Sequence, residues 1–154
     1  MDMMEIKFEW LLTAQVLTSV AMAGVIWIIQ IVHYPLFAQV GTESFVQYAA
    51  SHNRLITWVV APLMLIELLV SLGLLTPLTP PGLRIAAVIG MILLAIIWIT
   101  TFGLSVPAHT RLADGFDPAA HARLVSTNWI RTVGWTLRAL LSIWMLVQLP
   151  SLAR

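Results

Sequence analysis

The four histidines are the side chains in this sequence best suited to chemistry, and each lies close to one end of a long apolar segment. His33 follows the first apolar segment and His52 precedes the second. His109 follows the third segment and His121 precedes the fourth. Neutral imidazole binds zinc, copper, iron and haem iron, and imidazole also exchanges protons near neutral pH. If the fold brings these segment ends together, His33, His52 and His109 are the predicted ligands of a metal ion (Cu, Fe or Zn) or a haem.

Charged and amide side chains also occur inside the apolar segments. Asn128, Arg131 and Arg138 have the spacing of one stripe along a helix, and Glu67 lies within the second apolar segment. An arginine that faces lipid costs about 2.5 to 3.5 kcal/mol on insertion scales, so the stripe is predicted to face the interior of a helix bundle. Glu67 is the evident opposite charge for Arg138. Glu67, Arg131 and Arg138 are therefore candidate catalytic groups, and a purely structural ion pair between Glu67 and Arg138 is the alternative.

The apolar segments that carry these residues are long enough to cross a membrane. The chain has 154 residues, of which 60% are hydrophobic and 10% charged, and its mean hydropathy is +0.92. A soluble domain has about 25% charged residues, and a helical crossing needs about 20 apolar residues. Four segments meet that length, at about 10–34, 54–75, 83–106 and 129–149. The sequence predicts one domain, 1–154, an all-α integral membrane protein folded as an up-down bundle of four transmembrane helices.

Four crossings place the two long connections, 35–53 and 107–128, on one side of the membrane. We call this side, which carries the histidines, the loop face. The first apolar segment is predicted to be retained as a span, because its leader is acidic and the apolar run is too long for a cleaved signal peptide. Counting Arg131 and Arg138 with the loop face makes that face the more basic one, which predicts that it lies in the cytoplasm.

Local signals predict where the helices at the loop face begin and end. Pro35 and Pro107 are predicted to interrupt the first and third helices and to leave backbone carbonyls that need partners, which nearby histidines could supply. Asp117 followed by Pro118 has the pattern of an N-cap and a first helical residue, so the fourth helix is predicted to begin near residue 118.

The two halves of the chain have related patterns. The spacing from Arg54 to Arg131 equals the spacing from Trp58 to Trp135, and each half reads as a span, a proline with a histidine, a connection and another span. An internal repeat of two helical hairpins would explain this pattern and would place a site at the interface of the halves. Chance similarity in a chain rich in leucine and tryptophan is the alternative. Trp58 and Trp135, with Asn128, are predicted to line the pocket for a cofactor or substrate.

The second half carries a family resemblance. The residues that carry it are Val106-Pro107-Ala108-His109-Thr110-Arg111-Leu112, Leu124-Val125-Ser126-Thr127-Asn128-Trp129 and the helix from Arg131 to Arg138. This stretch resembles the second half of the small four-span membrane proteins grouped with fungal and bacterial anthrone oxygenases, a mostly uncharacterised family. The sequence differs from that family at His109, where asparagine is usual, and at Trp135, where histidine is expected. The resemblance implies the four-span architecture and oxidative chemistry on a small hydrophobic or quinone-like molecule.

Two functions of different classes remain open from the sequence. The first is a membrane oxidoreductase or oxygenase with a polar, histidine-lined pocket for a metal, a haem or a lipophilic quinone-like substrate. The second is a non-enzymatic carrier, channel or binding subunit that uses the same cavity, and a homo-oligomer is a candidate assembly for it. For each histidine the simplest alternative is that it caps its own helix. The lipid bilayer and a small lipophilic molecule are the predicted partners, and a net charge of +1 without a basic cluster argues against nucleic acid.

Overall fold

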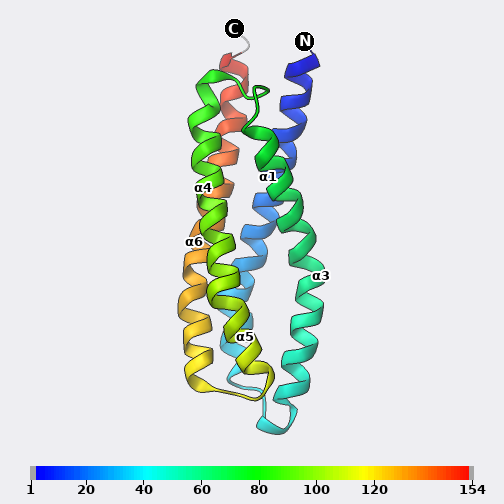
Figure 1. Ribbon diagram of the computed structural model, residues 1–154, viewed down its shortest axis with the longest axis vertical. Coiled ribbons are helices and arrows are strands. Elements are labelled where there is room, and N and C mark those ends of the chain that lie inside the picture. The colour runs from blue at the N-terminus through cyan, green and yellow to red at the C-terminus, as the bar shows by residue number, and fades with distance from the viewer. Residues whose placement is uncertain (1–2, 153–154) are drawn as a thin grey trace.

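The computed structural model describes residues 3–152 and consists of four long, alternating helical rods (Figure 1). The first rod is α1 (Met3–Ile28), which continues through a π-helical turn, η1 (Ile29–His33), into α2 (Tyr34–Phe37). The second rod is α3 (Thr42–Leu74). A short 3₁₀ turn, η2 (Pro81–Leu83), opens the third rod, which consists of α4 (Arg84–Thr100), a second π turn, η3 (Thr101–Ser105), and α5 (Val106–Ala113). The fourth rod is α6 (Pro118–Leu152). The predicted all-α four-helix bundle is confirmed.

Each rod is long and apolar enough to cross a membrane. The candidate spans are Met3–Phe37, Thr42–Leu74, Pro81–Ala113 and Pro118–Leu149, of 32 to 35 residues each. At the α-helical rise such a rod is about 50 Å long, so it extends beyond a hydrocarbon layer of about 30 Å. The outward side chains are apolar, as at Leu17, Ile85 and Ile99, which are 66%, 77% and 70% exposed. This surface fits a multi-pass integral membrane protein.

The rods pack in a ring in which one contact is weaker than the others. Rod α6 packs along both α1 and α4, and α1 packs along α3, whereas α3 and α4 contact each other less extensively. The approach of α6 to α4 is close at Gly134, where a Cβ atom would lie 2.9 Å from Cγ1 of Ile97.

The two prolines widen their helices rather than ending them, so the predicted helix ends near residues 34 and 106 were wrong. Tyr34, just before Pro35, donates its N–H to the carbonyl of Ile29, and Val106, just before Pro107, donates to Thr101. Both bonds reach back five residues, as in a π turn. A proline ring has no N–H and clashes with the carbonyl four residues earlier, and the wider turn makes room for it while the rod continues.

The two halves share one order of elements. Each has a long helix, a five-residue π turn, a short helix with proline at its second position, a brief connection and a helix of 33 or 35 residues. This order supports the predicted repeat of two hairpins. Asp117 begins α6 as predicted: its Oδ1 accepts hydrogen bonds from the N–H groups of Ala119 and Ala120, at 2.9 and 3.3 Å.

Candidate functional site

The four histidines surround the ring of one residue, Phe37, at the loop-face end of the bundle. The ring centroid of Phe37 lies 5.0 Å from that of His33, 5.1 Å from His52, and 6.4 Å from each of His109 and His121. Phe37 is fully buried, because the first rod continues past its π turn and carries this side chain into the centre of the bundle. Nothing in the sequence distinguished Phe37 from an ordinary loop aromatic, because the first helix was expected to end before it.

Three of the histidines form a connected row. Nε2 of His33 and Nδ1 of His52 share a hydrogen bond of 2.7 Å. The His52 ring stacks on the His109 ring, with centroids 5.6 Å apart, and Nε2 of His109 shares a hydrogen bond of 3.0 Å with the Tyr34 hydroxyl. The predicted convergence of His33, His52 and His109 is therefore present, and Tyr34 is a further member that sequence reasoning did not single out.

The fourth histidine, His121 of α6, does not cap its own helix but bonds to a backbone carbonyl of the first rod. Nε2–H of His121 donates to the backbone carbonyl of Tyr34 at 2.7 Å, directly before Pro35. A histidine that supplies a partner for a carbonyl beside the proline matches the expectation from the sequence. His121 is therefore structural in this arrangement.

The predicted metal or haem site stays a prediction, and in this structure the facing nitrogens of His33 and His52 are hydrogen-bonded to each other. A metal ion held by His33 and His52 would lie about 2.0 to 2.1 Å from each nitrogen, but the facing nitrogens bond to one another at 2.7 Å, which is a hydrogen-bond distance. The nearest nitrogen of His109 is bonded to Tyr34. Among the described residues, no group of three or more histidine, aspartate and glutamate side chains is placed to hold a metal ion. The row is better suited to hydrogen bonding and proton transfer.

Arg131 and Asn128 lie beside this row, held by side chains from the two π turns. Asn128 is fully buried and donates from Nδ2 to Oε1 of Gln30 at 2.8 Å. Nη1 of Arg131 donates to Oδ1 of Asn128 and to Oγ of Ser105, both at 3.2 Å. The positive charge of the Arg131 guanidinium also interacts with the Tyr34 hydroxyl and with the imidazole of His109. Gln30 and Ser105 belong to this hydrogen-bond network because the π turns direct their side chains into the bundle. A π turn before each Xaa-Pro pair was not predicted from the sequence.

A cavity of about 340 Å³ opens between α3 and the third rod, and we call it the polar cavity. Its hydrogen-bonding wall contains Tyr34, His52, Ser105, His109 and Arg131. The rest of the lining is mixed: it contains the polar residues Asn53, Thr57, Thr101 and Thr110 and the apolar residues Ile29, Ile56, Val60, Ala61, Met64, Phe102 and Val106. Ligand pockets in proteins have volumes of about 300 to 1,000 Å³ and combine apolar walls with a few polar groups. The polar cavity has this character.

A second, apolar hollow lies on the other flank of α3. This apolar groove has a volume of about 580 Å³ and runs between α3 and the first rod. His33 and His52 both contribute to its wall, and His52 also lines the polar cavity. The hydrogen-bonded histidine pair therefore lies between the two spaces.

Glu67 and Arg138 meet in a separate polar layer nearer the chain termini, as predicted. Oε1 of Glu67 accepts hydrogen bonds from Nε of Arg138 at 2.9 Å, Oγ of Ser19 at 2.6 Å and Nε2 of Gln15 at 3.0 Å. Arg138 also donates to the carbonyl of Gly90 and to Oγ of Ser71. Four rods are thus joined at one level.

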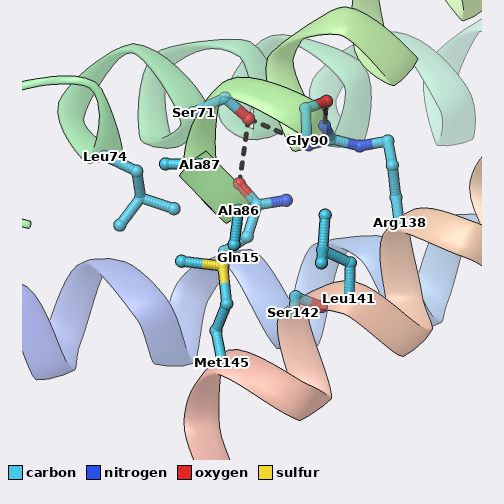
Figure 2. A pocket seen from close by; sticks show the side chains of 10 residues that line it. All are labelled: Gln15, Ser71, Leu74, Ala86, Ala87, Gly90, Arg138, Leu141, Ser142 and Met145. Atoms are coloured by element: carbon cyan, nitrogen blue, oxygen red, sulfur yellow. Dashed lines mark hydrogen bonds between the residues drawn. The ribbon is translucent and has the colours of Figure 1, made fainter. Parts of the chain in front are cut away.

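Figure 2 shows one side of this layer, where Gln15, Ser71, Gly90 and Arg138 surround a small cavity. Its volume is about 20 Å³, which is room for about one water molecule. The layer is too closed to admit a substrate.

An apolar layer separates the Glu67 layer from the polar cavity. Most of the buried residues between the two levels are apolar, and they include Met22, Ile26, Met64, Leu94, Ile97 and Trp135. Thr132 is also buried there, and its hydroxyl bonds to the carbonyl of Asn128 in its own helix. Trp135 is fully buried here and lines none of the cavities described above. Trp58 is 76% exposed on α3 and also lines none of them. The two tryptophans predicted to form pocket walls therefore lie outside the pocket, whereas the third predicted pocket residue, Asn128, supports it through Arg131.

The chain matches no protein-family model, no curated protein and no solved structure. The resemblance to the anthrone oxygenase-like proteins stays a prediction. The function of the chain is therefore inferred from the geometry of the polar cavity.

Proposed function

We propose that this chain is a membrane oxidoreductase that binds a small lipophilic molecule of the quinone or hydroxyaromatic type in the polar cavity. The observation that carries the proposal is the composition of that cavity, whose lining combines hydrogen-bonding groups, among them His52, His109 and Arg131, with apolar side chains. An apolar body with one or two oxygens fits such a site, because the apolar walls hold the body and the polar groups orient it. The position of the cavity within the spans lets such a ligand arrive from the bilayer.

The row of histidines supplies the proton transfer that this chemistry needs. His109 and Arg131 line the cavity and would hold a ligand oxygen by hydrogen bonds. His52 also lines the cavity and is bonded to His33, which is partly exposed, so a proton accepted by His52 can be released through His33. Oxidation of a hydroquinone to a quinone releases two electrons and two protons. Dioxygen, which dissolves in lipid, would accept the electrons and the protons and become hydrogen peroxide.

Glu67 and Arg138 have a structural role in this proposal. The apolar layer around Trp135 separates them from the polar cavity, and their hydrogen bonds are made to one another and to neighbouring rods. Of the three candidate catalytic residues, only Arg131 lines the cavity.

The proposal is tested by closing the cavity. Wild-type protein in lipid nanodiscs is expected to bind 1,4-naphthoquinone and to accelerate the oxidation of 1,4-dihydroxynaphthalene, followed by the absorbance of the quinone formed. Ala61→Phe should reduce binding at least tenfold, because Ala61 lines the cavity. Ala95→Phe is the matched control, since Ala95 is exposed on the outer face of α4 and lines no cavity described here. If Ala61→Phe binds the quinone as wild type does, the cavity is not the site.

A carrier or binding subunit is the second candidate, and the position of the apolar groove favours it. The groove and the polar cavity share His52, Ile29 and Ile56, so a small molecule could pass between them around α3. In that case the protein would bind 1,4-naphthoquinone but would not accelerate the oxidation of 1,4-dihydroxynaphthalene. Ala61→Phe would then reduce quinone binding, with no oxidation rate to lose. The apolar layer argues against a polar channel across the whole bundle, so proteoliposomes should hold a proton gradient.

A further inference from the structure

The two buried arginines of α6 differ in one respect. Arg131 is 6% exposed and Arg138 is 3% exposed, so both guanidinium groups are taken out of solvent. Arg138 has a carboxylate partner, Glu67, at 2.9 Å. Arg131 has no carboxylate partner among residues 3–152: its neighbours are Ser105, Asn128 and the Tyr34 hydroxyl, and its Nε is buried without a hydrogen-bond partner among these residues.

A buried cation without a counter-charge is costly to keep. Arginine stays protonated in proteins, so it cannot escape this cost by losing its proton. Neutral hydrogen bonds satisfy some of its donors but leave its charge uncompensated, and an uncompensated buried charge is strongly destabilising. The same helix shows at Arg138 that this fold can supply a carboxylate where one is needed structurally. The missing negative charge at Arg131 is therefore expected from outside the chain.

The surroundings of Arg131 point to a bound ligand as its source. Arg131 lines the polar cavity, and no aspartate or glutamate lines it. Of the two aspartates at this end of the bundle, Asp117 is used to cap α6, and Asp114 lines no cavity described here. Tyr34 and His109, which share one hydrogen bond, also line the cavity, and the Tyr34 hydroxyl interacts with the guanidinium.

We propose that the polar cavity binds a lipophilic organic acid in its anionic form, with the acidic oxygen of a phenolate, enolate or carboxylate against Arg131. Hydrogen bonds between a guanidinium and an anionic oxygen are charge-assisted and about twice as strong as neutral ones. The apolar lining residues, among them Ile56, Val60 and Met64, hold the carbon skeleton, and an inorganic anion would leave these side chains uncovered. This inference rests on the proposed function, since it takes the polar cavity as the ligand site, and it adds the charge of the ligand.

The test compares two probes that share one ring system. At neutral pH 2-hydroxy-1,4-naphthoquinone is an anion, whereas 1,4-naphthoquinone is neutral. Each is titrated into wild-type protein in nanodiscs of zwitterionic lipid, and the partition of each probe into empty nanodiscs is subtracted. Wild type is expected to bind the anionic probe at least tenfold more tightly than the neutral one.

Variants of α6 assign this preference to Arg131. Arg131→Met should bind both probes alike, and Arg131→Lys should keep part of the preference because it keeps the positive charge. Arg123→Met is the matched control, since Arg123 is exposed at the loop-face end of the same helix and does not line the polar cavity, so its preference should equal that of wild type.

The possible outcomes separate this inference from the function on which it rests. Equal binding of the two probes by wild type overturns the anionic ligand and leaves the ligand-binding cavity standing. Binding of neither probe overturns both. If Arg131→Met does not fold, the wild-type comparison and Arg131→Lys still decide. A preference that is reduced but retained in Arg131→Lys supports the assignment to Arg131, and a preference equal to that of wild type overturns it.

Discussion

Arg138 donates its Nε–H to Oε1 of Glu67 at 2.9 Å, and the side chains of the two residues are only 2% and 0% exposed. The pair joins α6 to α3, and the further bonds of Arg138 to Gly90 and of Glu67 to Ser19 bring α4 and α1 to the same level. In a bundle whose outer surface is apolar, this layer fixes how the four rods are aligned along their axes. Its stability should depend on both charges being present.

Removing one member of the pair should therefore cost more than removing both. Glu67→Gln is expected to lower the free energy of unfolding by about 3 to 5 kcal/mol, because it leaves the buried guanidinium of Arg138 without a counter-charge. The same change in an Arg138→Met background should cost much less. Equilibrium unfolding in mixed detergent micelles measures the free energy of unfolding of wild type, of each single variant and of the double variant, which together form a double-mutant cycle. Additive effects, within about 0.5 kcal/mol, would show that the two side chains do not interact.

The close approach of α6 to α4 makes Gly134 sensitive to any added side chain. Gly134→Ala would place a Cβ 2.9 Å from Cγ1 and 3.1 Å from Cδ1 of Ile97, so it is expected to destabilise the protein by about 1 to 3 kcal/mol through overpacking. Gly24→Ala is the matched control, because nothing lies within 4 Å of a Cβ at that position of α1. Thermal unfolding of the two variants should differ clearly. Equal stability of the Gly134→Ala and Gly24→Ala variants would show that α4 and α6 are not closely packed at Gly134.

The hydrogen bond between His33 and His52 should be visible in nuclear magnetic resonance spectra of protein labelled with ¹⁵N at histidine. A bond of 2.7 Å between two ring nitrogens predicts a scalar coupling across it and slow exchange of the shared proton with water. His52→Asn should abolish the coupling, whereas His121→Asn should keep it, because His121 bonds to the Tyr34 carbonyl. If the signals instead shift together on addition of stoichiometric Zn²⁺ or Cu²⁺, the pair is a metal site and the hydrogen-bonded arrangement is wrong.

The position of the loop face relative to the membrane can be measured with single cysteines, since the chain contains none of its own. Ser44 and Asp114 are exposed near the helix ends at the loop face, and Met4 and Thr76 are exposed near the helix ends at the opposite end. If the loop face lies in the cytoplasm, as the sequence predicts, an impermeant maleimide should label the first two positions only from the cytoplasmic side and the last two only from the outside. The reverse partition would refute the predicted orientation, and a mixed partition would refute the four-span topology.

Features that depend on local chemistry or on the cost of burying charge could be predicted from the sequence. The four helices follow from four long apolar runs, because a backbone in lipid has to bond to itself. The cap at Asp117 needs only its neighbours Ala119 and Ala120. The meeting of Glu67 and Arg138 follows because each charge needs a partner in the bundle interior, and no other opposite charge was evident deep in the spans.

Features that depend on how each helix is rotated about its axis were decided only by the tertiary structure. Trp58 and Trp135 each follow an arginine by four residues, yet Trp58 is 76% exposed and Trp135 is fully buried. The π turns before Pro35 and Pro107 are the reason that sequence periodicity fails at the loop face, because a wider turn changes the direction of every side chain beyond it. Phe37 is aimed between the four histidines by that change of direction. Whether imidazoles at neighbouring helix ends face a metal ion or one another depends on rotations of a few tens of degrees, which packing against the other rods decides and no local sequence signal encodes.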